Sequence, residues 1–251
     1  MADELLSLRV IVVLRSVDDH DLFRHAAAAL SVPVEVFAAD TALAACRFLA
    51  DGADLVLLDG ALPNEEIGQI VALARATRDR PFTVLLVDAG DADPTFATDA
   101  LATKPALLHE AKRLIGRAIR VRLPSRVLVV DDSATMRSIV RKILTATRFP
   151  FEFGEADEGF AALKLASQGN FDLAFLDYNM PEFSGLETLA EFKREKRSLD
   201  VVLMTSMQDE SLAERAQAEG AAFLKKPFYA ADIEAVLCGF YGLRALNPNR
   251  A

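Results

Sequence analysis

The chain has 251 residues, enough for two domains of ordinary size, and 52% of them are hydrophobic, which is ample for buried cores. The net charge of −9 and the absence of any cluster of five or more basic residues argue against direct binding to nucleic acid, which depends on neutralising phosphates. No apolar run is long enough to span a bilayer, and the N-terminus lacks the pattern of a secretory signal. We therefore expect a cytoplasmic protein without membrane insertion.

The two halves of the chain repeat one sequence pattern. The segment RVIVV from Arg9 resembles RVLVV from Arg126, and DLVLLD ending at Asp59 resembles DLAFLD ending at Asp177. Repetition over this length predicts two domains of the same fold.

Within each half, short apolar runs alternate with amphipathic stretches. Fully apolar runs of about four residues are typical of strands buried on both faces of a parallel sheet. In the second half these runs are Val127–Val130, Phe151–Phe153, Leu173–Leu176, Val201–Met204 and Ala222–Leu224. Between the first two, apolar residues recur with the spacing of one helix face; they are Met136, Ile139, Val140, Ile143 and Leu144. The pattern predicts an α/β fold: two doubly wound, five-stranded parallel-sheet (flavodoxin-like) domains in tandem.

The expected boundaries follow from the repeat and from Pro124, which ends the preceding helix. We expect a first domain at 1–121, a short linker at 122–125, a second domain at 126–246 and a tail at 247–251. On this division we expect no separate output domain.

Polar residues in the second half gather at the predicted carboxyl ends of the strands. Asp131 and Asp132 follow the first strand, Asp177 ends the third, Thr205 ends the fourth and Lys226 follows the fifth. Because these ends share one edge of a doubly wound sheet, we expect the side chains to lie close together. Carboxylates this close repel one another unless a cation lies between them, and Mg²⁺ prefers such oxygen ligands.

This arrangement also suits phosphoryl transfer. A carboxylate can attack phosphorus and form an acyl phosphate, while a metal ion and a lysine neutralise the transferred group. Lys226 would supply the cation, and the Thr205 hydroxyl would donate a hydrogen bond to a phosphoryl oxygen.

The segments VLVVDDSATMRSIVRKIL, FLDYNMPEFSGLE, LMTS and FLKKPF resemble the response-regulator receiver family, most of all its single-domain, CheY-like chemotaxis type. The resemblance implies that Asp177 is the phosphoacceptor and that Thr205 and Lys226 bind the phosphoryl group. It also implies Mg²⁺ ligands, which would be Asp131 (mainly through water), Asp132, Asp177 and the backbone carbonyl of Asn179. Phe223 takes the place of the family's switch aromatic. The implied phosphodonor is a histidine kinase or a histidine phosphotransfer protein.

Simpler interpretations of these residues remain open. The pair Asp131-Asp132 precedes a predicted helix, and its role could be no more than to cap that helix. Thr205 could be an ordinary residue at a strand end, and Phe223 could simply pack in the sheet.

The corresponding site in the first half is incomplete. Asp59 and Lys104 keep their positions, whereas Leu14 and Arg15 replace the acidic pair. Two further replacements are read from the repeat, Asp88 for Thr205 and Ala61 for Asn179. We hypothesise that Arg15 pairs with Asp59 or Asp88 where a metal would lie, which makes this half a pseudo-receiver that is not phosphorylated through Mg²⁺. Asp18 and Asp19 are interpreted as the acidic first turn of a helix.

The leading functional hypothesis is a two-component response regulator that signals through a downstream protein target. The signalling face would include apolar residues of the last helix, a surface that could equally be core; they are Ile233, Val236, Leu237, Phe240 and Tyr241. The first half would be a docking, homodimerising or regulatory module. Alternatives are a phosphate sink or relay intermediate and a Mg²⁺-dependent aspartyl phosphatase, although the DxDxT motif of such phosphatases is missing.

Overall fold

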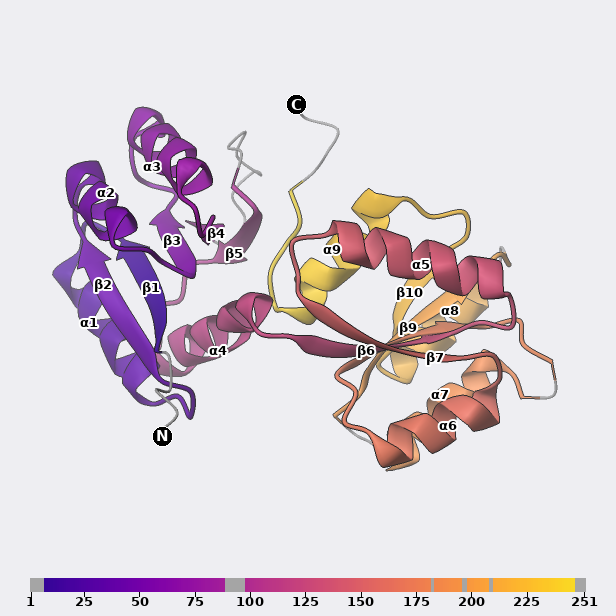
Figure 1. Ribbon diagram of the computed structural model, residues 1–251. Coiled ribbons are helices and arrows are strands. Elements are labelled where there is room, and N and C mark those ends of the chain that lie inside the picture. The colour runs from indigo at the N-terminus through magenta and orange to yellow at the C-terminus, as the bar shows by residue number, and fades with distance from the viewer. Residues whose placement is uncertain (1–6, 89–97, 182, 196–197, 208–209, 247–251) are drawn as a thin grey trace, which may run out of the picture. The chain divides into compact units, whose positions relative to one another are not determined.

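The computed structural model describes residues 7–88, 98–181, 183–195, 198–207 and 210–246 (Figure 1). It divides into two compact units. The first comprises Met1–Arg122 together with Tyr241–Ala251, and the second comprises Leu123–Phe240. The sequence assigned residues 241–246 to the second domain, but in the structure they belong to the first unit. The expected tail at 247–251 lies outside the described residues.

The first unit is a parallel five-stranded sheet with helices on its faces. Its strands are β1 Leu8–Val13, β2 Val34–Ala39, β3 Leu55–Asp59, β4 Phe82–Val87 and β5 Ala100–Thr103. Its described helices are α1 Val17–Ala28, α2 Ala42–Ala50, α3 Asn64–Ala76, α4 Leu108–Ala118 and the 3₁₀ turn η1 Ile119–Arg122.

The second unit repeats this architecture with a five-stranded sheet of its own. Its strands are β6 Ser125–Val130, β7 Phe151–Ala156, β8 Leu173–Asp177, β9 Asp200–Thr205 and β10 Ala222–Lys225. Its helices are α5 Ala134–Ala146, α6 Gly159–Gln168, α7 Gly185–Glu195, α8 Glu210–Ala218 and α9 Ala230–Phe240. None of the helices in the described part of either unit is long and apolar enough to cross a membrane.

Both sheets have the same strand order. The orders are β2-β1-β3-β4-β5 and β7-β6-β8-β9-β10, and all neighbouring strands are parallel. The order reverses between the first and third strands of each unit, which is where doubly wound sheets place their ligands. The predicted fold class, two doubly wound parallel sheets in tandem, is confirmed.

The burial of the strands explains why their sequences are almost wholly apolar. Every residue of β3 and of β8 is buried, because helices cover both faces of each sheet. The first helices begin alike in the two units. Ser16 accepts a hydrogen bond from the N–H of Asp19 at 3.3 Å, and Ser133 accepts one from the N–H of Met136 at 3.4 Å. Asp19 and Met136 therefore occupy equivalent positions.

We predict that Phe175→Ala destabilises the second unit by about 3–5 kcal/mol, because it removes a large side chain from a fully buried position in β8. The matched control is Phe160→Ala in α6. Phe160 is 58% exposed and stacks on Phe183 with ring centroids 4.9 Å apart, so its loss should cost about 1 kcal/mol or less. Denaturant unfolding measures both, and equal losses would contradict the described core.

Candidate functional site

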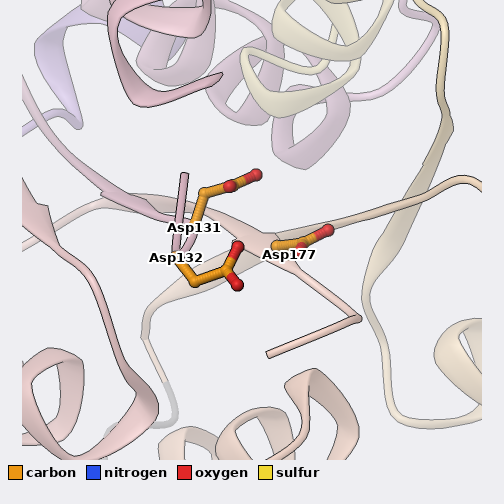
Figure 2. Close-up of side chains that lie close together, drawn as sticks. All are labelled: Asp131, Asp132 and Asp177. Carbon is orange, nitrogen blue, oxygen red and sulfur yellow. The ribbon is translucent and has the colours of Figure 1, made fainter. Parts of the chain in front are cut away.

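Three carboxylates meet at the carboxyl ends of β6 and β8 (Figure 2). Asp131 and Asp132 follow β6, and Asp177 is the last residue of β8. Each offers an oxygen atom within 4.8 Å of the others, and among the described residues this is the one such group that could hold a metal ion. Asp131 and Asp177 are only 1% and 4% exposed, whereas Asp132 is exposed. The cluster is therefore open to solvent on the side of Asp132.

Lys226 lies between two of these carboxylates. Its Nζ is 2.8 Å from Asp131 Oδ2 and 2.8 Å from Asp177 Oδ1. Burial opposes the charged ammonium, but the hydrogen bonds to the two carboxylates outweigh it and raise the pKa of Lys226. Burial also raises the pKa of Asp177, and Lys226 offsets this only in part. One ammonium against three carboxylates leaves a negative pocket that favours a further cation.

Hydrogen bonds from neighbouring residues hold Asp131 and Asp177 in place. The N–H of Ser133 donates to Asp131 Oδ1 at 2.9 Å, and the Arg137 guanidinium donates to the Asp131 carbonyl at 2.8 Å. The N–H of Asn179 donates to the carboxylate of Asp177. Asn179 thus lies beside the cluster, with its side chain exposed.

The remaining predicted residues surround the same strand ends. Thr205 is fully buried at the end of β9, and its hydroxyl oxygen accepts a hydrogen bond from the N–H of Met207 at 3.0 Å. The N–H of Lys226 donates to the Thr205 carbonyl at 2.7 Å, and the Lys226–Pro227 peptide is cis. Phe223 is half-buried on β10, opposite Leu203 of β9, and packs against the core of the second unit.

Gly185 allows the loop after β8 to fold back on the site. Its N–H donates to the Tyr178 carbonyl at 3.1 Å. A Cβ at this position would overlap the carbonyl oxygen of Asp177 and lie 2.8 Å from the Tyr178 Cα. Only glycine fits here without displacing the residue that carries the central carboxylate.

The first unit corrects the predicted replacement of Thr205 by Asp88. Asp59 pairs with Leu86 across β3 and β4, just as Asp177 pairs with Met204 across β8 and β9. The residue equivalent to Thr205 is therefore Val87, which is buried and has no hydroxyl. Asp88 is exposed one position further along the chain.

The hypothesis that Arg15 pairs with Asp59 or Asp88 is also wrong. The Arg15 guanidinium pairs with Glu66 at 3.1 Å. The cation at this site is Lys104, whose Nζ is 2.8 Å from Asp59 and 3.0 Å from Asp19. Arg15 is exposed at the start of the loop to α1, and Glu66 in α3 provides its carboxylate.

Asp19 is the residue of the first site that sequence reasoning missed. It occupies the first turn of α1, as expected, but its carboxylate also contacts Lys104. The equivalent position in the second unit is Met136, while the strand-end position of Asp131 is taken by the fully buried Leu14. One carboxylate has in effect moved from the strand end to the helix. An acid three residues after the N-cap Ser16 was the available signal.

The charged side chains of the first site consequently form ion pairs with one another. Lys104 contacts two carboxylates, as Lys226 does, but the third carboxylate is replaced by Arg15, which points to Glu66. Burial opposes the ammonium of Lys104, and the hydrogen bonds to Asp59 and Asp19 outweigh it and raise its pKa. The described residues of this unit contain no group of three metal-ligating side chains.

Comparison with known proteins agrees with the second unit's geometry. Residues 127–237 match the model of the response regulator receiver domain. Chemotaxis protein CheY-3 of Vibrio cholerae serotype O1 is 36% identical over 112 residues, which are 43% of this chain and 85% of that protein. Chemotaxis protein CheY of Pseudomonas aeruginosa is 35% identical over 108 residues, 42% of this chain and 86% of that protein.

Solved structures that match nearly the whole chain include the following one. It is a putative two-component system response regulator/GGDEF domain protein, with a TM-score of 0.54 and 21% identity, and the match covers 93% of this chain and 98% of that one. At this identity the likeness shows the fold alone, including the two successive sheets.

We predict that Gly185→Ala destabilises the second unit by about 1–3 kcal/mol, because the new methyl group displaces the backbone of Asp177. Gly239→Ala is the matched control. A Cβ at Gly239 in α9 meets nothing within 4 Å, and alanine there should stabilise the helix by about 0.5–1 kcal/mol. Thermal unfolding that shows the same sign for both variants would contradict the close approach at Gly185.

We predict that Lys104→Met destabilises the first unit by about 1–3 kcal/mol, because Asp59 and Asp19 lose their shared ammonium. The pKa of Lys104 is raised, so its contribution is present below the ordinary value of 10.5 and lost as the pH rises through the higher value. The difference between wild type and variant should therefore be constant around neutral pH.

Urea unfolding measures this difference, and the double variant Asp59→Asn/Lys104→Met provides its control. Removing both partners leaves less uncompensated charge, so the double variant should be more stable than the single one. A double variant less stable than Lys104→Met would show that the pair does not stabilise the unit as described.

Proposed function

The chain belongs to the response-regulator receiver family, and we propose that it accepts a phosphoryl group on Asp177 from a phosphohistidine and then signals through a downstream protein. The coarse assignment, a two-component response regulator, rests on the family match. The assignment of Asp177 is supported by one observation above all: three carboxylates and Lys226 share one site at the carboxyl ends of the strands.

The residues at this site fit Mg²⁺. The carboxylates of Asp131, Asp132 and Asp177 are hard oxygen donors, and the backbone carbonyl of Asn179 is the proposed fourth protein ligand. When bound, Mg²⁺ would neutralise negative charge that develops on the phosphoryl oxygens. The chain's own groups then orient the reaction: the Lys226 ammonium, which Asp131 also contacts, holds the Asp177 carboxylate.

The proposed transfer forms one bond and breaks one. An oxygen of Asp177 bonds to phosphorus as the bond from phosphorus to the donor imidazole nitrogen breaks, and that nitrogen keeps the electron pair. Lys226 Nζ, 2.8 Å from Asp177 Oδ1, can follow the new phosphate, and the buried Thr205 can donate its hydroxyl to it. The protein promotes its own phosphorylation and hydrolysis and is not an enzyme that turns over a separate substrate.

A protein phosphodonor is supported by the surface next to the site. A cavity of about 340 Å³ adjoins Lys226 and is mostly apolar. It is lined by Met136, Ile139, Ser206, Pro227 and Phe228 in addition to the lysine. Ile139 is 41% exposed, so this large apolar side chain lies at the surface and not in the core. A histidine kinase or phosphotransfer protein is the proposed occupant.

For the output, we propose a switch in which Phe223 responds to Thr205. The two lie on neighbouring strands, β10 and β9, and Phe223 is only half-buried, so its ring has room to move. The expected apolar signalling face on α9 is narrower than the sequence implied, because Ile233 and Leu237 are fully buried in the core. Tyr241 lies beyond the end of α9, is fully buried and belongs to the first unit. The first unit is proposed to act as a regulatory module without phosphorylation, with Lys104 paired to Asp59 and Asp19.

We predict that acetyl phosphate phosphorylates the wild-type protein in the presence of Mg²⁺ and not in the presence of a chelator. Asp177→Ala should abolish the incorporation. Asp59→Ala is the matched control at the equivalent position of the first unit, and it should retain full incorporation. Phosphate content measured by intact mass separates these outcomes.

Two results would contradict this proposal. Mg²⁺-dependent labelling that survives Asp177→Ala and disappears in Asp59→Ala would move the phosphoacceptor to the first unit. Sustained hydrolysis of p-nitrophenyl phosphate, lost in Asp177→Ala, would instead make the protein an aspartyl phosphatase.

A further inference from the structure

The segment Tyr241–Leu246, here called the C-terminal strap, is built into the first unit although it follows the last helix of the second. Tyr241 is fully buried and Leu243 is 4% exposed. Leu246 packs against a core cluster of the first unit that includes Leu58, Val87 and Leu101. Three of the six residues of the strap thus have buried or packed apolar side chains. An unattached chain end would not bury so many.

The strap is also hydrogen-bonded to the edge of the first sheet (Figure 1). The N–H of Arg244 donates to the Leu101 carbonyl at 2.7 Å, and the N–H of Leu101 donates to the Arg244 carbonyl at 2.8 Å. The bridge is antiparallel, although the sheet itself is parallel. Leu101 is on β5, the edge strand, whose outer N–H and C=O groups would otherwise lack a strand partner.

Gly242 provides a third, independent sign of a fitted contact. Its φ is +70°, a conformation that favours glycine. A Cβ at this position would lie 2.6 Å from Cδ of Arg117 in α4. The strap therefore passes so close to the Arg117 side chain that any Cβ at position 242 would require that side chain to shift.

We propose that the first domain binds the chain's own C-terminal strap, on the surface formed by β5 and α4, and thereby holds the end of α9. Phe240 ends α9, and the strap begins at the next residue, so no linker separates the helix from its anchor. The chain enters the second unit directly after Arg122 and returns to the first directly after Phe240. The docking contact is formed by residues of the first unit alone, so it does not rest on the proposed phosphorylation of Asp177.

The experiment measures amide hydrogen exchange by NMR on the full chain. In the wild type, the amides of Leu101 and Arg244 should be protected because each donates within the bridge. Leu243→Asp places a charge in a buried position and should speed the exchange of both by about tenfold or more. The amides of β8 should remain protected, because that strand belongs to the second unit.

A pair of glycine variants provides a milder test if Leu243→Asp disturbs folding. Gly242 and Gly220 both have φ +70°, but a Cβ at Gly220 would meet only Lys193 Nζ at 3.8 Å. Both alanine variants carry the same backbone cost, and only Gly242→Ala adds the collision with Arg117. Gly242→Ala should speed exchange at Leu101 about fivefold or more, and Gly220→Ala should leave it unchanged.

Rapid exchange of Leu101 and Arg244 in the wild type would overturn the proposal, as would unchanged exchange at Leu101 in both Leu243→Asp and Gly242→Ala. Phosphorylation of Asp177 by acetyl phosphate, measured on the same variants, keeps the two proposals apart. Loss of labelling in every protein, including the wild type, would contradict the proposed function and leave the exchange result standing. Faster exchange in the last turn of α9 in Leu243→Asp would support the anchoring of that helix.

Discussion

The second unit is organised around the electrostatic cost of placing several carboxylates at one edge of a parallel sheet. The strand order brings the ends of β6 and β8 together, so Asp131 and Asp177 are buried side by side. Like charges at this distance are unstable without a cation. Lys226 reaches both carboxylates from the end of β10, yet Asp132 remains on the open side with its charge unbalanced. The need for a further cation therefore arises from the carboxylates placed at this edge of the second sheet.

The first unit meets the same constraint with a different solution. It keeps the lysine and one strand-end carboxylate, Lys104 and Asp59, and takes its second carboxylate from the helix residue Asp19. Leu14 fills the vacated strand-end position with an apolar side chain. The charges of this site balance more closely than those of its counterpart. Two domains with one topology can therefore differ in chemistry through the number and positions of the carboxylates at the same sheet edge.

Much of the fold followed from periodicity, because fully apolar runs separated by amphipathic stretches specify buried parallel strands and covering helices. The edge that carries the candidate site was also predictable, since strand ends are fixed by the order of the sheet: Asp177 and Lys226 lie together where the pattern placed them. Side-chain partners were not. The ion pairs Arg15–Glu66 and Lys104–Asp19 both join residues far apart in the sequence. Sequence spacing contains no information about which of several nearby carboxylates a flexible cation contacts. The sequence aligned Asp88 with Thr205, whereas the structure aligns Val87 with it, because the register of β4 is set by its pairing with β3.

The C-terminal strap was missed for a related reason. Residues 241–246 continue directly from α9, so proximity in sequence assigned them to the second domain, whereas burial of Leu243 and the bridge at Leu101 assign them to the first. An edge strand exposes backbone groups that any extended segment can pair with. A chain that returns to its own first domain supplies such a segment without the entropic cost of bringing two molecules together. Because the strap is part of the same chain, even this short strand pairing is enough to keep it bound to the first domain.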